Sequence, residues 1–347
     1  MIQLNLMAET NRLTRLSELG DKLETITKAP INWNKFKRIL DEAFPDKTKS
    51  GKGGRPPFDL LLLFKMCLLQ SWYGLSDEQL EYQINDRLSF QRFLNLDLTS
   101  KVPDRNTIWM FKEKLNNTFV ELDIFHMFVK ELTSLGIVTR EGSIIDATFV
   151  EAPRQRNSRD ENRQIKEGEI PKEWSEKKRS HKDIDATWTK KNNVVYYGYK
   201  DHIKADKDSK IITSYSVTTA SVHDSQVAAE LIDEHDKEAW FDSAYVGEEL
   251  EKEIRENSPE ITLHINEKGY KNKPLTDEQK ASNRVKSKVR ARVEHVNGQM
   301  TMCGGLFVRS IGILRANIAV FFKNMAYNLS RFSFLTVKKP FLEPPRG

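Results

Sequence analysis

The stretch Ser143-Ile-Ile-Asp-Ala-Thr-Phe-Val150 decides the fold, because it is an apolar run with a carboxylate, Asp146, in its interior. A second run, Ala239-Trp-Phe-Asp242, ends on Asp242, and Glu294 lies within a strongly basic, helix-like stretch. A carboxylate in an apolar strand loses hydration, so it needs a cation or strong hydrogen-bond donors. Two strands and one helix that carry such carboxylates therefore indicate a site for divalent metal ions.

The chemistry of these three carboxylates fits phosphoryl transfer. Mg²⁺ prefers oxygen ligands and keeps several of its waters. Two such ions about 3.5–4 Å apart can activate an attacking oxygen and stabilise a leaving one. Asp146, Asp242 and Glu294 would supply the protein ligands and a substrate phosphate the bridging ones. We expect two Mg²⁺ ions, with Mn²⁺ as a substitute; for each carboxylate taken singly, an ordinary strand-end or surface role is the alternative.

Composition places the chain among globular proteins. Its 347 residues, 38% hydrophobic and 30% charged, are enough for two domains and a sizeable core. The longest apolar run, Leu60 to Leu69, contains Lys65 and is too short to span a bilayer, and the first ten residues lack an apolar signal core. The two cysteines do not have the spacing of a metal site. We expect a cytoplasmic protein without a membrane partner, and the net charge of +5 favours an anionic partner.

The N-terminal part of the sequence predicts helices. Residues 1–30 form a polar lead that allows one short helix, residues 31–136 a helical domain, and residues 336–347 a tail. Ser76 and Asp104 each precede a helical pattern as N-cap residues. Short capped helices joined by tight turns favour a DNA-binding module of the helix-turn-helix type, although an ordinary helical bundle fits the pattern equally well.

Basic residues of this helical part are candidate DNA contacts. Lys52 and Arg55 lie in a loop rich in Gly, Pro and Lys, and Arg105 begins the helix that follows Asp104.

The hydrophobic period changes from Ile144 onward. Residues 141–335 predict a strand, two hairpin strands, a helix, a strand, a helix, a strand and two helices. The predicted strands are 144–150, 194–202, 211–219, 239–242 and 261–265, and the predicted helices are 224–234, 247–255, 275–302 and 315–334. This order is that of the ribonuclease H-like α/β fold, a mixed sheet with helices on its faces.

A charged segment, residues 151–193, interrupts this pattern between the first and second strands. Its few apolar residues cannot form a core of their own, so the sequence predicts an insertion that is mobile when free. Either it contacts DNA and becomes ordered on binding, or it is a solvated linker.

The helix that carries Glu294 also carries a strip of basic residues. Arg290 and Glu294 are four residues apart and share one face, and Asn297 lies near the same face. Basic side chains beside a carboxylate site offset the charge of a DNA backbone, whereas the alternative is a solvated charged face. The candidate phosphate contacts on this helix are Arg284, Lys288, Arg290 and Arg292.

Nine short motifs follow one another along the chain. They are Gly54-Arg-Pro-Pro-Phe-Asp59, Trp72-Tyr-Gly-Leu-Ser-Asp77, Asp104-Arg-Asn-Thr107, Ile144-Ile-Asp-Ala-Thr148, Gly198-Tyr-Lys-Asp-His202, Val222-His-Asp-Ser225, Phe241-Asp-Ser-Ala-Tyr-Val-Gly247, Arg290-Ala-Arg-Val-Glu294 and Asn324-Met-Ala-Tyr-Asn-Leu329. In this combination and order the chain resembles the DDE-type transposases of bacterial insertion sequences, most of all the insertion-sequence-five group, from about residue 33 to residue 333.

The resemblance implies that Asp146, Asp242 and Glu294 are the catalytic triad and the metal ligands. In the tyrosine, arginine, glutamate, lysine signature of the family, Ser287 replaces the tyrosine and Thr301 the lysine.

Three further residues, His202, His223 and Asp224, match family positions near the site. With Asn297 they are accessory candidates, and a structural role for each is the alternative.

The resemblance also implies a function. A transposase binds the terminal inverted repeats of its element, cuts the DNA at the element ends and joins the 3′-hydroxyl to target DNA by metal-dependent phosphoryl transfer. The implied partner is double-stranded DNA, with a homodimer on paired ends, a nucleoid-associated location and no small-molecule substrate. Two alternatives remain: a non-catalytic DNA-binding protein derived from a transposase, and a ribonuclease H-like nuclease without strand transfer.

Overall fold

A computed structural model describes residues 8–45, 56–97, 99–191, 193–270 and 274–338. Contacts divide the described chain into two compact units. The second unit is Val138–Phe321, and the first contains the described residues before and after it. The stretch from residue 322 onward therefore packs with the N-terminal helices, although the sequence placed residues up to 335 in the catalytic domain.

The first unit is helical, as the sequence predicted. Its helices before residue 138 are α1 (Ala8–Glu18), α2 (Lys22–Lys28), α3 (Trp33–Ala43), α4 (Leu60–Tyr73), α5 (Asp77–Asp86), α6 (Leu88–Leu94), α7 (Arg105–Leu115) and α8 (Val120–Ser134). Both predicted caps are confirmed: Ser76 forms a capping box with Gln79, and Asp104 accepts a hydrogen bond from the Thr107 amide. Helix α4 is buried on most of its circumference because it is apolar all round.

For the polar N-terminal lead the sequence allowed one short helix, and the structure contains two. Helices α1 and α2 lie within residues 1–30, and Leu23 and Ile26 are fully buried. Asp21 caps α2 and pairs with Arg92 of α6 at 2.5 Å. Arg92 also pairs with Glu24 of α2 at 3.3 Å. Two buried apolar residues and two ion pairs therefore hold this short helix, and two apolar residues are too few to produce a periodic signal in the sequence.

The second unit is built on one mixed sheet. Its strands are β1 (Ser143–Glu151), β2 (Thr187–Lys191), β3 (Val194–Asp206), β4 (Ile212–Thr219), β5 (Glu238–Phe241) and β6 (Thr262–Ile265). Its helices are α9 (Arg159–Lys166), α10 (Glu176–Ser180), α11 (Ser225–Leu231), the 3₁₀ helix Ser243–Tyr245, α12 (Glu248–Asn257), α13 (Asp277–Met302) and the first residues of α14 (Ile313–Lys338).

Strand pairing gives the sheet the predicted ribonuclease H-like topology. Strand β3 pairs antiparallel with β1 and β4, whereas β1, β5 and β6 run parallel. The short β2 pairs with the first residues of β3. Close approach of β1 and β3 requires Gly198, because a Cβ there would lie 2.3 Å from the carbonyl oxygen of Val150 and its φ is +143°.

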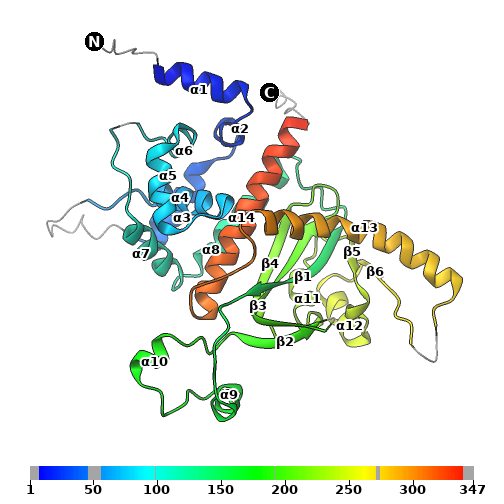
Figure 1. Cartoon of the computed structure of the whole chain (residues 1–347). Helices are drawn as coiled ribbons and strands as arrows, with labels where there is room; N and C mark the ends of the chain where they lie inside the picture. Colours follow the sequence, from blue (N-terminus) through cyan, green and yellow to red (C-terminus); the bar gives the residue numbers. More distant parts are fainter. Residues whose placement is uncertain (1–7, 46–55, 98, 192, 271–273, 339–347) are drawn as a thin grey trace, which may run out of the picture. The chain divides into compact units, whose positions relative to one another are not determined.

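Helices cover both faces of this sheet (Figure 1). Helices α11 and α12 pack against one face in a core cluster that contains Ile145 of β1 and Phe241 of β5. Helix α13 contacts β1 and β5. Neighbouring residues in a strand point to opposite faces, so the residue after Ile145 and the residue after Phe241 face away from the α11 and α12 core.

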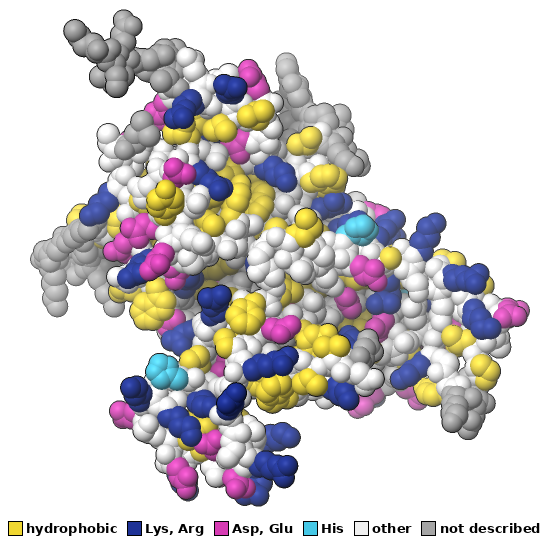
Figure 2. Space-filling model, in the orientation of Figure 1, with side chains coloured by type: hydrophobic (Ala, Val, Ile, Leu, Met, Phe, Trp, Pro, Cys, Tyr) yellow, Lys and Arg dark blue, Asp and Glu magenta, His cyan; other side chains and the backbone are white. Residues whose placement is uncertain are grey.

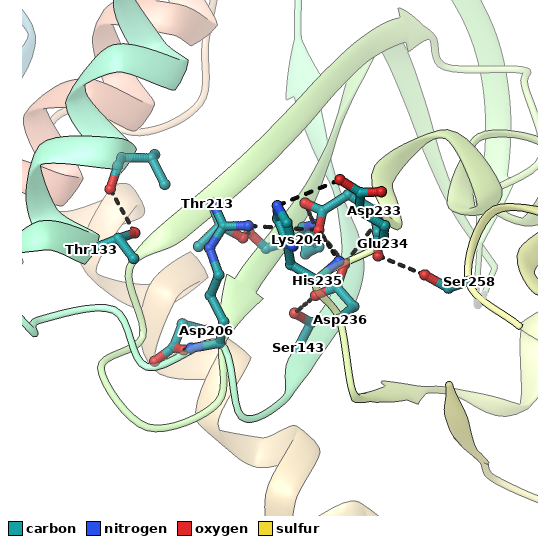
Figure 3. A network of polar contacts seen from close by, with 12 residues as sticks. Thr133, Ser143, Lys204, Asp206, Thr213, Asp233, Glu234, His235, Asp236 and Ser258 are labelled. Carbon is teal, nitrogen blue, oxygen red and sulfur yellow. Dashed lines mark hydrogen bonds and ion pairs between the residues drawn. The ribbon is translucent and has the colours of Figure 1, made fainter. Parts of the chain in front are cut away.

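A buried ion network fixes the beginning of β1 (Figure 3). Lys204 of β3 donates to Asp233 at 2.8 Å and to Asp236 at 2.7 Å, and the Ser143 hydroxyl donates to Asp236 at 2.5 Å. The Lys204 side chain is 2% exposed, so this charge is compensated almost entirely within the protein.

None of the described helices combines the length and apolar character needed to cross a membrane.

Candidate active site

Strand register places Asp146 beside Asp242. Ser143 pairs with Ala239 and Ile144 with Trp240 on the parallel strands β1 and β5. Two residues further along the same register, Asp146 is level with Asp242. Because Ile145 and Phe241 belong to the core on the other face, both aspartates project toward α13.

Helix α13 reaches both aspartates. Arg290 approaches Asp242, with 3.8 Å between Nη2 and Oδ2, and the Asn297 amide donates to Oδ2 of Asp146 at 3.1 Å. Arg290, Glu294 and Asn297 are spaced four and three residues apart, so they share one face of the helix. Glu294 therefore lies between the two helix positions that contact the aspartates.

The Glu294 side chain is exposed, and it does not complete a preformed ligand cluster. Among the described residues, no three His, Cys, Asp or Glu side chains lie close enough together to hold one metal ion. The structure thus brings together Asp146, Asp242, Arg290 and Asn297, and it places Glu294 on the adjoining helix face.

Burial destabilises the charged form of Asp146. Loss of hydration raises the pKa of this carboxyl, an effect that the positive charge of Arg290 opposes and the negative charge of Asp242 increases. Asp242 keeps more of its hydration, because its side chain is 28% exposed. It accepts a hydrogen bond from the Ala244 amide at 2.6 Å. When burial destabilises the ionised form of a carboxylate, a cation placed beside it stabilises that form strongly.

Three polar atoms at this site are buried and lack a hydrogen-bond partner within the described parts of the chain: the Tyr245 hydroxyl, Nε of Arg290 and Oδ1 of Asn297. Buried polar groups are nearly always paired in a finished structure. Unpaired donors and acceptors beside two carboxylates leave groups at this site that are available to pair with a ligand.

Tyr245 had no role in the prediction from sequence. It is 1% exposed, and burial raises its pKa, with further increases from the charges of Asp224 and Asp146. The sequence did contain a signal for Tyr245. This tyrosine stands three residues after Asp242, on the turn that positions this aspartate.

The donor set fits a hard divalent cation. Its charged members are carboxylates, and Asn297 adds an amide oxygen without another partner among the described residues. Asp146 and Asp242 would hold the ions on the sheet, and Glu294 would add its carboxylate from α13.

The accessory candidates lie elsewhere around this site. His202 is buried on the α11 face of β3, its Nε2 lies 2.8 Å from the Thr218 hydroxyl, and burial lowers its pKa to about 4. Such an imidazole is neutral at physiological pH. His223 is exposed, with Nδ1 2.7 Å from the Ser225 hydroxyl. Asp224 accepts from Lys200 at 2.7 Å, a contact that the sequence did not predict.

The predicted DNA contacts are distributed unevenly. Arg284 and Lys288 are exposed on α13. Arg292 is bound to Asp208 and to the Lys207 carbonyl, each at 2.8 Å.

In the helical unit, Arg105 pairs with Glu78 on the surface. Lys52 and Arg55 lie outside the described residues.

Comparison with known proteins identifies the class to which this fold and site belong. The family model of the transposase DDE domain matches residues 138–329, more than half of the chain. A second model, a transposase domain (DUF772), matches residues 11–114. The chain therefore belongs to the transposase DDE domain family, whose members are enzymes that cut and transfer DNA strands, and such domains generally depend on divalent metal ions.

One solved structure also resembles the chain. It is the cryo-EM structure of a piggyBac transposase synaptic complex with hairpin DNA, 12% identical over 94% of this chain and 82% of that chain, with a TM-score of 0.39.

Proposed function

We propose that this transposase binds the terminal inverted repeats of an insertion sequence, cleaves the DNA at the element ends and joins the freed 3′-hydroxyl to target DNA. The observation that carries the proposal is the placement of Asp146 on β1 and of Asp242 directly after the neighbouring parallel strand β5, facing a helix whose Arg290 and Asn297 contact them. The unpaired buried atoms around this pair indicate that a ligand completes the site.

Asp146, Asp242 and Glu294 are the proposed ligands of two Mg²⁺ ions, for which Mn²⁺ can substitute. When bound, these ions would polarise the phosphate and stabilise charge on the attacking and leaving oxygens. Asp146 must be ionised to take this part, and Asn297 holds its carboxylate in place. Arg290 is suited to a phosphate, since its Nε is unpaired among the described residues and a guanidinium donates two parallel hydrogen bonds.

The helical unit is the proposed reader of the inverted repeats. Its capped helices fall within the range that matches the second transposase domain model. We infer further that two copies act together, because two element ends must be joined, and that the enzyme works on chromosomal DNA in a bacterial cytoplasm.

Cleavage of DNA that contains the repeats from either side of the gene tests the proposal. Asp146→Ala, Asp242→Ala and Glu294→Ala should each abolish cleavage in Mg²⁺ and leave repeat binding largely intact. Glu249→Ala, at an exposed position of α12, is the matched control. Cleavage at the wild-type rate in any one of the three variants would remove that residue from the site.

Product analysis separates the alternatives. Cleavage followed by joining supports a transposase, cleavage without joining supports a nuclease, and repeat binding without cleavage supports a DNA-binding protein. Ca²⁺ should allow binding but not chemistry, because its coordination geometry is looser than that of Mg²⁺. Full cleavage in excess chelator would contradict metal dependence.

A further inference from the structure

The chain directly after β6 is attached to α13 on both sides of Asn266. The Asn283 side chain accepts a hydrogen bond from the Glu267 amide at 2.9 Å and donates to the Glu267 carbonyl at 3.0 Å. Lys286 donates to the Ile265 carbonyl at 2.8 Å. These contacts hold the backbone against α13, so the attachment does not depend on the Asn266 side chain.

Asn266 and Asp242 stand at the carboxyl ends of neighbouring strands. Phe241 pairs with Ile265 on the parallel strands β5 and β6, and Asp242 and Asn266 each follow directly. The Asn266 amide continues this ladder, because it donates to the Phe241 carbonyl at 3.3 Å. Hydrogen-bonded strands lie about 4.8 Å apart, so these two residues are close neighbours.

Both side chains reach the same face of α13. Asp242 lies 3.8 Å from Arg290, and Nδ2 of Asn266 donates to the Ser287 hydroxyl at 3.1 Å. Ser287 and Arg290 are three residues apart, so they are neighbours on the helix surface. Two strand ends and one helical turn therefore bring Asn266 to the carboxylate of Asp242.

The Asn266 amide is only half paired. Its Nδ2 is bound to Ser287, whereas its Oδ1 is buried and has no hydrogen-bond partner within the described parts of the chain. Buried amide oxygens are normally paired, and an oxygen of this kind is satisfied by a cation or by a hydrogen-bond donor. A phosphodiester has no hydrogen to donate, so the DNA backbone alone does not complete this group.

A hydrated divalent ion has the chemistry that this oxygen lacks. Mg²⁺ binds oxygen ligands at about 2.1 Å and keeps several waters, each of which donates hydrogen bonds. The basic side chains of α13 serve a different ligand: Figure 2 shows Lys and Arg side chains along this helix, and Lys280, Arg284 and Lys288 are exposed. Such side chains suit phosphates, whereas the ion must be bound by oxygens from the strand ends.

We propose that Asn266 is a further residue of the divalent-cation site, and that its amide oxygen binds the hydrated ion held by Asp242. This inference rests on the proposed function, which places such an ion at Asp242. Ser287, which replaces the tyrosine of the family signature, is then a positioning residue, because its hydrogen bond fixes the orientation of the amide. An uncharged oxygen adds affinity for the ion without placing another negative charge beside the DNA phosphate.

The affinity of the full-length protein for Mn²⁺ tests this site, measured without DNA by electron paramagnetic resonance of the free ion. Asn266→Ala should weaken Mn²⁺ binding roughly 10- to 100-fold, as removal of a supporting group at a metal site generally does. Asn266→Asp keeps the oxygen and the size of the side chain, so it should bind Mn²⁺ at least as tightly as wild type. The control, Asn257→Ala, removes an exposed amide at the end of α12 and should keep the wild-type affinity.

Two further measurements assign the effect to this site. In an Asp242→Asn background, Asn266→Ala should cause no additional loss of Mn²⁺ affinity, because both residues act on the same ion. The melting temperature of Asn266→Ala in chelator should stay close to that of wild type, since the contacts of Asn283 and Lys286 remain.

Equal Mn²⁺ affinities for wild type and Asn266→Ala would overturn the proposal, as would an additional loss in the Asp242→Asn background. A large fall in melting temperature with unchanged Mn²⁺ affinity would make Asn266 a structural residue. Failure of the wild type to cleave repeat DNA would instead contradict the proposed function, and the Mn²⁺ affinities would still decide the role of Asn266.

Discussion

Two polar clusters involve strand β1 and differ in how completely their polar groups are paired. At the beginning of β1, Lys204, Asp233 and Asp236 form a closed network with contacts of 2.7 and 2.8 Å (Figure 3). Further along β1, Asp146 and Asp242 have looser contacts of 3.1 and 3.8 Å with α13, and three buried atoms nearby lack partners within the described chain.

The difference teaches what each cluster is for. A closed network leaves no group for a ligand and stabilises the fold only as a complete unit. An open cluster keeps part of its desolvation cost until a ligand arrives, which is expected where a cation and a phosphate must bind. Both clusters contain buried carboxylates, so partner satisfaction, and not burial, separates the structural from the functional one.

The largest expected effect is on chemistry at the open cluster. Asp146→Asn should reduce cleavage by at least about 10³-fold, because a metal ligand contributes several kcal/mol to stabilising transition-state charge. The melting temperature without metal should stay constant or rise, since a buried charge is removed. Single-turnover cleavage and thermal melts measure the two effects. A large fall in melting temperature would instead make Asp146 a structural residue.

At the closed cluster we expect a substitution to lower the stability of the fold and to leave the chemistry unchanged. Lys204→Met leaves buried Asp236 without its cation, so we expect a loss of about 3–5 kcal/mol in the free energy of unfolding. Urea titration measures it, and chemistry in the remaining folded protein should be unchanged. Lys237→Ala, which breaks an exposed pair with Glu141, is the control and should cost at most about 1 kcal/mol.

A compensating variant sharpens this prediction. Lys204→Met with Asp236→Leu removes both members of the buried pair and should recover part of the lost stability. If the double variant is less stable than Lys204→Met alone, the network acts through more than charge compensation.

A variant of Arg290 tests whether this residue acts in catalysis or in stabilising the fold. Arg290→Lys keeps the charge but loses the fork geometry of the guanidinium. We therefore expect the activation free energy of cleavage to rise by about 1.5–3 kcal/mol, which slows cleavage roughly 10- to 150-fold. The pair with Asp242 is long and partly exposed, at 21% and 28% of the two side chains, so melting should change little. A large fall in melting temperature with unchanged chemistry would assign Arg290 to the fold.

The smallest expected effect is a pH dependence of stability. Burial raises the pKa of Asp146, so the folded protein binds this proton more tightly than the unfolded chain does. Stability from the protonated form is present at low pH and is lost as the pH rises through the raised pKa. In the presence of chelator, the melting temperature of wild type should therefore fall relative to that of Asp146→Asn as the pH rises. A pH-independent difference would show that Asp146 keeps an ordinary pKa.

The sequence carried most of the architecture because hydrophobic period and capping are local. The caps at Ser76 and Asp104, the strand around Asp146 and the long helix with Glu294 all begin within a few residues of their predicted places. The segment 151–193 differed, because its order comes from Trp174 and the Asp183 contacts. Contacts with residues far away in the chain leave no periodic signal.

The candidate active site also combines features that the sequence determined with features that only the tertiary structure decided. The sequence by itself determined the residue types: carboxylates in apolar strands and a basic helix that presents Arg290, Glu294 and Asn297 on one face. Only the tertiary structure decided that Asp146 and Asp242 both contact α13, that Asn297 holds Asp146, that Arg292 is bound to Asp208, and that Tyr245 is buried nearby. The physical reason is that strand order, sheet face and helix packing bring distant residues together, whereas composition and spacing report only on neighbours along the chain.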